Sequence, residues 1–443
     1  MKIEIDENGF TFPEVPLPKV WTVEQLFDTP TLTAVEVEAA TRASVQSLLK
    51  ERTLSPGSTV AVGVGSRGLD NLVLVVRTVV EELRSCGLRP FIAPAMGSHG
   101  GATAEGQIEV LHSYGITTEA TGAEIRATME VEAIGTLEGD SAGEFAGHPV
   151  WFDKIAFGAD AVLLINRIKP HTDFTGELES GIGKMCAIGF GKRKGAEGIH
   201  FYGSRGLRDL IPRIARFLAS KIPILGGVAL LENELGRTSK IVALPNSEIA
   251  CEGEKALLRE ARGMSPRLPF HELDVLIIDE MGKNISGAGM DTHVIGRGTM
   301  PSIPEHTWGG PDIRIIAVLD VTDESHGNIT AVGLADLTTK KLIDKGDFSV
   351  SLINMRTSGE GGVLRARIPV IQPTGEDCVR TGIACCGALD RNKVKLARIR
   401  NTADTRFLEI TEGLLEIARA APTLRVSEEP HLIDLNRSPG NLA

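Results

Sequence analysis

Three glycine-rich segments of this 443-residue sequence carry the side chains best suited to chemistry. His99 lies in MGSHGG, and His171, Lys184 and His200 lie in the segment spanning residues 166–200. Neighbouring glycines let a ligand approach an imidazole closely, and an imidazole with an ordinary pKa near ~6.5 can transfer protons at neutral pH. A lysine whose pKa is lowered by partial burial can bond covalently through its amine. We therefore expect acid–base chemistry near a covalently attached group, with a solvated Lys184 at a helix end as the alternative.

The third segment is GVGSRG, residues 63–68. It fits G-x-G-x-x-G, but the next strand ends in APAMGSHG and lacks the acidic residue that holds the ribose of NAD. Classical NAD binding is therefore not expected. The glycines, Ser66 and a helix N-terminus could instead cradle a phosphate, while the Arg67 guanidinium suits a phosphate or a carboxylate. A tight turn with a solvated Arg67 is the alternative.

The residues around Lys184 exclude a Walker-type phosphate loop, because Met185 rather than Ser or Thr follows the lysine. Imidazoles bind nickel, zinc, copper and iron, so His99, His171 and His200 could together form a hydrolytic three-histidine zinc site. Lys184 has no role in such a site. A metal-dependent hydrolase is therefore a second interpretation.

A further loop, residues 279–291, contains Lys283 and follows a strand-like run. Loops of this kind often face substrates, which makes Lys283 a candidate, and a plain interdomain loop is the alternative. Cys385 and Cys386 lie on an apolar helical pattern and are predicted to be core residues rather than nucleophiles. Lone histidines among turn residues are weaker candidates: His293, His306 and His326.

An alternation of strands and helices is predicted to position these residues. Residues 60–64, 69–85 and 90–95 read as strand, helix and strand, which is typical of a βαβ unit with a parallel sheet. Residues 160–166 predict a buried strand with a polar C-terminal end, where open α/β sheets place ligands. Other expected elements are a helix capped by Thr103 through residues 108–114, helices at 207–219 and 254–262, and strands at 226–231 and 240–243.

The breaker segment GMSPRLPF indicates a boundary between a first domain, residues 1–268, and a second α/β domain, residues 269–405. Residues 406–443 are expected to form a helix and a loose tail that pack back on the first domain. The predicted fold class is α/β, with two α/β domains of mainly parallel sheets and an active site in the cleft between them. Elements expected after the boundary are strands at 274–279, 313–319 and 350–354, and helices at 377–389 and 409–420.

Composition narrows the class of protein. Hydrophobic residues make up 42% and charged residues 24%, as in ordinary globular proteins. The net charge of −11 opposes attraction to nucleic acid or an anionic membrane surface. The six cysteines have neither disulfide-framework density nor paired zinc spacing, and no run of about 18 apolar residues is present. We expect a cytoplasmic protein with no structural zinc and no nucleic-acid or membrane partner.

The order GSHG, PH, SGIGK and a following histidine resembles the nickel-dependent lactate racemase family, most closely over residues 60–205. That family uses a nickel-pincer nucleotide, the nickel complex of pyridinium-3-thioamide-5-thiocarboxylic acid mononucleotide. The resemblance implies that Lys184 is joined to this cofactor through a thioamide and that His200 completes the nickel coordination. It makes the first domain the cofactor-binding and catalytic one.

The same resemblance implies roles for the other candidates. His99 and His171 match the proton acceptor and donor on opposite faces of the substrate, and Arg67 matches an arginine beside substrate and cofactor. Lys283 matches a lysine of the second domain. The remaining expected cofactor contacts are Gly65, Ser66 and Gly181.

The sequence departs from the family pattern at two places. Residues 64–68 read VGSRG where the family has Asp-x-x-Arg-Pro, so Val64 stands in place of the aspartate and that residue's contact is not carried over. The interval before Lys184 is longer and adds GELES, with Glu177 and Glu179. We therefore expect a remodelled substrate pocket rather than one for lactate.

The resemblance implies an isomerase, a racemase or epimerase of a 2-hydroxy acid or sugar acid. A proton on a hydroxyl-bearing carbon is too weakly acidic for a histidine alone, so inversion is easier by hydride transfer while a histidine takes the hydroxyl proton. Expected partners are this small-molecule substrate, the cofactor-synthesis proteins and a second copy of the chain in a homo-oligomer. A non-catalytic protein that carries the cofactor is a third interpretation.

Overall fold

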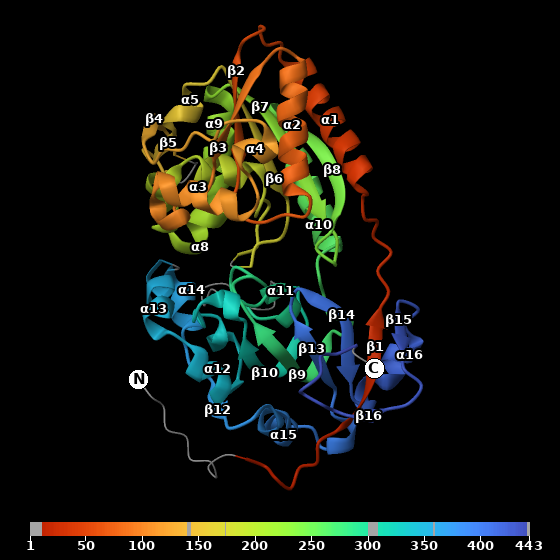
Figure 1. Ribbon diagram of the computed structural model, residues 1–443. Coiled ribbons are helices and arrows are strands. Elements are labelled where there is room, and N and C mark those ends of the chain that lie inside the picture. Colours follow the sequence, from red (N-terminus) through yellow and green to blue (C-terminus); the bar gives the residue numbers. More distant parts are fainter. Residues whose placement is uncertain (1–10, 140–142, 173, 300–308, 358, 441–443) are drawn as a thin grey trace. The chain divides into compact units, whose positions relative to one another are not determined.

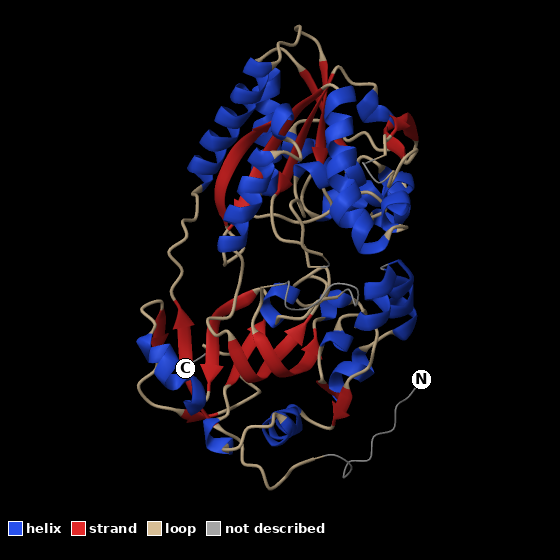
Figure 2. Ribbon diagram, turned by 180° about the vertical axis from the view of Figure 1, so that it is seen from behind, coloured by secondary structure: helices blue, strands red, loops and turns tan. Residues whose placement is uncertain are grey.

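The computed structural model describes residues 11–139, 143–172, 174–299, 309–357 and 359–440. The chain divides into two compact units. The first unit comprises Thr29–His171 and Thr175–Ser265, and the second comprises Met1–Asp28, Thr172–Phe174 and Pro266–Ala443. Each unit is built on its own β-sheet, drawn in red in Figure 2. No helix in the described ranges is long and apolar enough to span a membrane.

The first unit has a five-stranded sheet in the order β3-β2-β6-β7-β8. The first four strands run parallel and β8 is antiparallel to β7. The predicted βαβ unit and parallel sheet are therefore confirmed. The strands are β2 (Thr59–Val64), β3 (Arg89–Pro94), β6 (Ala161–Arg167), β7 (Ile224–Glu232) and β8 (Thr238–Pro245).

Helices cover both faces of this sheet. On one face, α1 (Ala34–Glu51) and α2 (Leu72–Ser85) lie side by side (Figure 1) and bury valines and leucines against β2, β6 and β7. On the other face, a Cβ atom on Gly63 would lie 2.8 Å from the Phe190 ring, and one on Gly227 would lie 2.5 Å from the Ile182 side chain. These strand glycines let the segment that contains Lys184 pack directly on the sheet.

Shorter elements complete the first unit, including a β-hairpin of β4 (Val131–Thr136) and β5 (Pro149–Asp153). Thr103 caps α3 as predicted, because its hydroxyl accepts a hydrogen bond from the Gly106 N–H. The helical segments are η1 (Gly100–Ala102), α3 (Ala104–Ser113), α4 (Thr118–Thr121), α5 (Lys154–Phe157), α6 (Ile182–Lys184), the π-helix η2 (Met185–Gly189), α7 (Lys192–His200), α8 (Gly203–Arg205), the π-helix η3 (Gly206–Leu210), α9 (Ile211–Lys221), η4 (Asn246–Glu248) and α10 (Glu252–Gly263).

The second unit contains a nine-stranded sheet in the order β12-β11-β10-β9-β13-β14-β1-β15, with β16 also paired to β1. Strands from β12 to β13 are parallel, and the pairs that involve β14 or β1 are antiparallel. The α/β class is confirmed, and this sheet has an antiparallel part that the sequence pattern did not predict. Its strands are β1 (Lys19–Gln25), β9 (Glu272–Met281), β10 (Asp312–Val321), β11 (Leu337–Thr339), β12 (Val370–Gln372), β13 (Leu396–Asn401), β14 (Asp404–Ile410), β15 (Leu424–Val426) and β16 (His431–Leu432).

Helical segments pack on both faces of this sheet as well. Cys386 is buried as predicted, whereas Cys385, the last residue of α15, is exposed and is not a core residue. His306 lies outside the described residues. The segments are α11 (Thr292–Ile295), η6 (Asp323–Ser325), η7 (Val332–Leu334), α12 (Lys340–Lys345), α13 (Phe348–Thr357), α14 (Gly359–Arg365), α15 (Gly375–Cys385), η8 (Arg391–Lys393) and α16 (Glu412–Ala420).

The strand predicted at residues 350–354 is wrong, since these residues lie within α13. Asp347 begins that helix, because its carboxylate accepts hydrogen bonds from the N–H and the hydroxyl of Ser349. An aspartate in this position satisfies backbone donors that a helix start leaves unpaired. This local signal outweighs the apolar run that suggested a strand.

Both ends of the chain also differ from prediction. The first domain was expected to contain residues 1–268, but β1 pairs with β14 and β15 in the second unit. Residues 406–443 belong to this second unit too and do not form a separate segment on the first. The helix predicted at 409–420 is confirmed as α16, but it begins three residues later because β14 extends to Ile410. The expected loose tail has defined structure within residues 428–440, since β16 pairs with β1 and Ile433 is buried.

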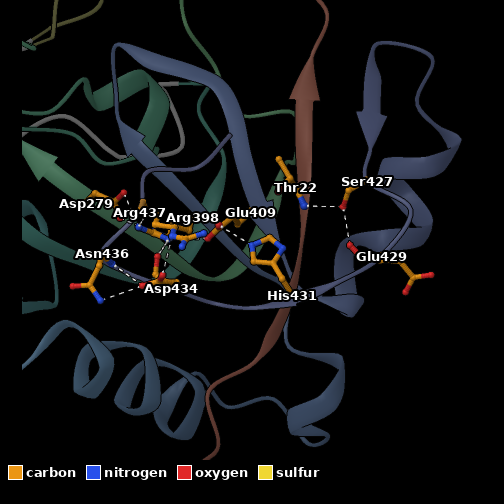
Figure 3. Close-up of polar contacts among 10 residues, drawn as sticks. All are labelled: Thr22, Asp279, Arg398, Glu409, Ser427, Glu429, His431, Asp434, Asn436 and Arg437. Carbon is orange, nitrogen blue, oxygen red and sulfur yellow. Dashed lines mark hydrogen bonds and ion pairs between the residues drawn. The ribbon is translucent and has the colours of Figure 1, made fainter. Parts of the chain in front are cut away.

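Arg398, on β13, explains why the C-terminal segment is ordered (Figure 3). Its side chain is fully buried and forms a two-bond ion pair with Asp279, at 2.7 and 3.0 Å, and a 2.8 Å ion pair with Glu409. The carbonyls of Asp434 and Arg437 accept its remaining N–H groups at 2.9 and 2.6 Å. The guanidinium is thereby fully hydrogen-bonded, as a buried arginine requires.

Replacing Arg398 by methionine should lower the free energy of unfolding of the protein by about 3–5 kcal/mol, since two buried carboxylates would lose their cation. Urea unfolding followed by circular dichroism measures this loss. Arg400→Met is the matched control on the same strand: its exposed pair with Glu280 should contribute at most about 1 kcal/mol. Equal losses in the two variants would contradict the assignment of Arg398 as the stabilising centre.

Candidate active site

The loop after β3 presents His99 and packs closely against η2. The Gly97 N–H donates to the Gly189 carbonyl at 3.0 Å. A Cβ atom on Gly97 would lie 3.1 Å from a methyl of Ile188, and one on Gly189 would lie 2.7 Å from the Ala95 carbonyl oxygen. Gly97 also has a φ of +61°, which favours glycine. The glycines beside His99 therefore serve backbone packing, which brings this loop next to the helix that follows Lys184.

The helix α6 that carries Lys184 is held by a buried carboxylate. Glu254 accepts hydrogen bonds from the N–H groups of Gly183, at 2.9 Å, and Ala250, at 2.8 Å. Burial raises the pKa of the Glu254 carboxyl above its ordinary value, against the effect of these backbone donors. Gly181, expected as a cofactor contact, makes room for this group, because a Cβ atom there would lie 2.4 Å from Glu254 Oε1. Lys184 itself is half-buried.

Four of the predicted site residues are close enough to interact electrostatically. The pKa of His99 is lowered to about 4 by loss of hydration and by the positive charges of Arg67, Lys184 and His200. Loss of hydration is the largest of these causes, and the neighbouring charges act in the same direction. The structure thus brings Arg67, Lys184 and His200 around a histidine that stays neutral at pH 7.

The turn after β2 places Arg67 at the surface, where it is exposed. The Tyr114 hydroxyl donates to the Ser66 carbonyl at 2.9 Å and so supports the turn. A Cβ atom on Gly65 would lie 3.4 Å from the terminal methyl of Met185, the residue after Lys184. Gly65 and the Lys184 segment are thus neighbours, as the resemblance implies.

The phosphate cradle expected at this turn is not formed as predicted. Helix α2 begins only at Leu72, and its N-cap residue, Asn71, has a left-handed backbone and no capping hydrogen bond. The adjacent Asp70 carboxylate accepts the N–H of Thr238 on β8 at 2.8 Å. Residues 69–71 therefore separate the glycine turn from the helix N-terminus.

His171 lies in the long loop after β6, and the added acidic residues shape that loop. Its N–H donates to Glu179 Oε2 at 2.6 Å, and the buried Glu179 carboxylate also pairs with Arg262 at 2.6 Å. Glu177 instead forms a 2.5 Å surface ion pair with Lys255. Glu179 therefore fixes the backbone at His171. We still predict, from the resemblance, that the ring of His171 faces His99 across a substrate.

Lys283 belongs to the second unit, in the loop after β9. Its Nζ donates to the Gly287 carbonyl and its N–H donates to the Ser325 hydroxyl, each at 3.0 Å. These bonds give the loop a defined shape. A contact between Lys283 and the candidate site residues of the first unit remains a prediction.

The three-histidine interpretation gains no support from the geometry. Within the described part of the chain, no three His, Cys, Asp or Glu side chains are grouped as a metal ion would require. His99, His171 and His200 are therefore not assembled as a zinc site in this structure.

Sequence reasoning missed one important residue, Lys192. It is completely buried although it lies in the charged run GKRKG, and it pairs with the equally buried Asp153 at 3.0 Å. Burial lowers the pKa of Lys192, and Asp153 opposes this effect. Lys194, two residues on, is exposed and lies over the Trp151 ring. No sequence signal separates these two lysines.

Comparison with known proteins gives matches of structure alone. No protein-family model matches the chain, and neither does any curated protein sequence. The chain is similar to a structural-genomics crystal structure from Thermotoga maritima, with a TM-score of 0.51 and 13% identity over 86% of this chain and 99% of that one. It also matches a lactate racemase apoprotein from Thermoanaerobacterium thermosaccharolyticum, with a TM-score of 0.41 and 13% identity over 77% and 92% of the two chains. At this identity the first match bears on the fold alone, and the second TM-score is too low to bear on function.

Replacing Gly181 by alanine should lower the free energy of unfolding by about 1–3 kcal/mol, because the new methyl group displaces the Glu254 carboxylate from its backbone donors. Gly263→Ala is the matched control in the same unit, since a Cβ atom there meets nothing within 4 Å. Urea unfolding of both variants measures the difference. Equal stability of the two variants would show that Gly181 does not hold Glu254 in place.

Replacing Arg67 by glutamine should raise the pKa of His99 toward its ordinary value, because one of the repelling charges is lost. In the wild-type protein His99 should stay neutral as the pH falls below 6.5, the ordinary histidine value, and take up a proton only near pH 4. NMR titration of the imidazole, without cofactor, measures both values. Arg193→Gln, an exposed change on α7, should leave the titration unchanged. An unshifted pKa in Arg67→Gln would mean that the two groups are not neighbours.

Proposed function

We propose that this protein is a racemase or epimerase of a 2-hydroxy acid or sugar acid that uses a nickel-pincer nucleotide joined to Lys184. The observation that carries the proposal is the electrostatic proximity of His99 to Arg67, Lys184 and His200. These residues come from four segments: the turn after β2, the loop after β3, α6 and the end of α7. Their meeting supports a shared task, as the family resemblance implies.

The residues present suit such a cofactor. Lys184 offers a half-buried amine on a helix anchored by Glu254, and His200 offers an exposed imidazole at the end of α7. Gly65 lies against Met185 and leaves space without a side chain beside the lysine segment. In the proposal, Lys184 would hold the organic part and His200 would bind the nickel. When bound, the cofactor would supply an electrophilic ring with the chemistry of a reversible hydride acceptor.

His99 is suited to the proton transfer that accompanies hydride removal. Its imidazole is neutral at pH 7, so a ring nitrogen can accept the substrate hydroxyl proton as the carbinol becomes a ketone. The nearby charge of Arg67 makes the resulting imidazolium a stronger acid, which favours return of the proton. His171 would exchange the proton when the substrate presents its other face.

Arg67 is suited to hold the carboxylate that every 2-hydroxy acid carries. Its guanidinium is exposed, and a two-bond contact would fix both the position and the orientation of the substrate. Arg67 keeps its positive charge when Lys184 and His200 hold the cofactor, and this charge near His99 favours an anionic substrate in the same place. The proposed substrate class is therefore a carboxylate with an adjacent hydroxyl, and Lys283 is a proposed further contact from the second unit.

Production together with the cofactor-synthesis proteins, followed by peptide mass spectrometry and metal analysis, should reveal a nickel-containing adduct on Lys184. Lys184→Arg should carry no adduct, whereas Lys194→Arg, on exposed surface, should carry it as the wild type does. An unmodified Lys184 despite confirmed cofactor supply would refute the tethering. Zinc without an organic adduct, together with ester or amide cleavage, would indicate the hydrolase instead.

With loaded protein, His99→Ala and His171→Ala should retain the adduct but lose inversion of the substrate carbon by about 10²–10⁴-fold, as expected for loss of a general acid–base group. The measurement is chiral chromatography of single stereoisomers from a panel of 2-hydroxy acids and sugar acids. A full rate of inversion in either variant would disprove the paired roles. Loaded wild-type protein that inverts none of these acids would indicate a cofactor carrier.

A further inference from the structure

The buried ammonium of Lys192 joins elements that carry two of the proposed functional histidines. Lys192 is the first residue of α7, and His200 is the last. The Lys192 Nζ donates to the Pro94 carbonyl, at the end of β3, at 2.5 Å and to Gln107 Oε1, on α3, at 2.9 Å. It also pairs with Asp153, at the end of β5, at 3.0 Å. One charge thus connects β3, β5 and α3 to the start of α7.

Gln107 links Lys192 to the loop that contains His99. Its side chain is fully buried, and its Nε2 donates to the carbonyls of Gly97, at 3.0 Å, and His99, at 3.4 Å. A glutamine amide has one oxygen that accepts and one nitrogen that donates. Because an ammonium can only donate, Lys192 requires the Gln107 oxygen on its own side and so directs the Gln107 nitrogen at the loop.

The geometry of these contacts has a consequence for the active site. We infer that Lys192 is a positioning residue, which acts through Gln107 to hold the loop that presents His99. The inference rests on the proposed function because that function gives His99 its role. The contacts of Lys192 and Gln107 do not depend on the proposed function. Lys192 contacts none of the groups proposed to react, so its effect on turnover must pass through loop geometry.

The backbone of Lys192 is consistent with this role. Its φ is +52°, a left-handed conformation that a non-glycine residue rarely adopts. Such a conformation persists where surrounding contacts determine it and often marks functional sites. Here the side-chain contacts with Pro94, Gln107 and Asp153 provide that determination.

Gln107→Met is the direct test, because methionine matches the length of glutamine but cannot donate to the loop, while Lys192 keeps Asp153 and Pro94. Hydrogen exchange in the cofactor-free protein should speed up at the N–H groups of Gly97 and His99 by about 10-fold to 100-fold, as for loss of a hydrogen bond linked to a charge. In loaded protein, kcat for inversion of the substrate should fall by about 10-fold to 100-fold with an unchanged KM. A merely structural role would not separate kcat from KM.

Lys192→Met tests the connection through Gln107. The double variant Lys192→Met/Gln107→Met should have nearly the same loop exchange rate and the same loss of kcat as Gln107→Met alone. The reason is that both changes break the same chain of contacts. Should Lys192→Met fail to fold with Asp153 unpaired, the Gln107→Met results decide alone. Glu109→Gln, an exposed change on the same helix, is the control and should behave as the wild type.

The inference would be overturned if Gln107→Met kept both the wild-type kcat and the wild-type rate of amide hydrogen exchange in the His99 loop. It would also be overturned if Glu109→Gln raised that exchange rate as much as Gln107→Met does, since the loop would then respond to any change in α3. If loaded wild-type protein inverts no substrate, the proposed function fails, but amide exchange in the cofactor-free protein still decides whether Lys192 and Gln107 hold the loop.

Discussion

The buried ammonium of Lys192 is the constraint on which the proposed site depends. A cation removed from water destabilises a protein by several kcal/mol unless acceptors surround it. Asp153, Gln107 and the Pro94 carbonyl provide those acceptors from three different elements. The fold of the first unit is therefore stable only when these elements meet, and their meeting sets the start of the helix that ends at His200. A charge with no proposed part in the reaction thus determines where reacting groups lie.

The second unit also contains a buried cation whose acceptors come from several elements. Arg398 is as fully buried as Lys192, and its partners Asp279 and Glu409 lie on β9 and β14. Burial raises the pKa of Asp279 to about 6, and the Glu409 charge adds to this effect while Arg398 opposes it. The carbonyls of Asp434 and Arg437 complete the hydrogen bonding. This explains why a polar C-terminal segment without a strong hydrophobic pattern is nevertheless ordered.

Glycines contribute to the site through close packing more than through ligand contact. Gly97 and Gly189 allow the His99 loop to touch η2, and Gly181 leaves room for the Glu254 carboxylate. Gly63 lets Phe190 rest on the sheet. The glycine-rich segments that suggested close approach of a ligand therefore also bring protein segments together, and both uses need the absence of a side chain.

The sequence alone determined the local elements that bear the site: the runs at residues 60–64 and 160–166 predicted β2 and β6, because apolar patterning and turn signals act over a few residues. It also made His99, Lys184, His200 and Arg67 candidates by type, by glycine neighbours and by resemblance. Only the tertiary structure decided that Lys192 is buried while Lys194 is exposed, that Glu254 holds α6, and that β1 pairs with β14. These depend on partners far away in the chain, and no local pattern records which distant acceptor or strand will meet a given residue.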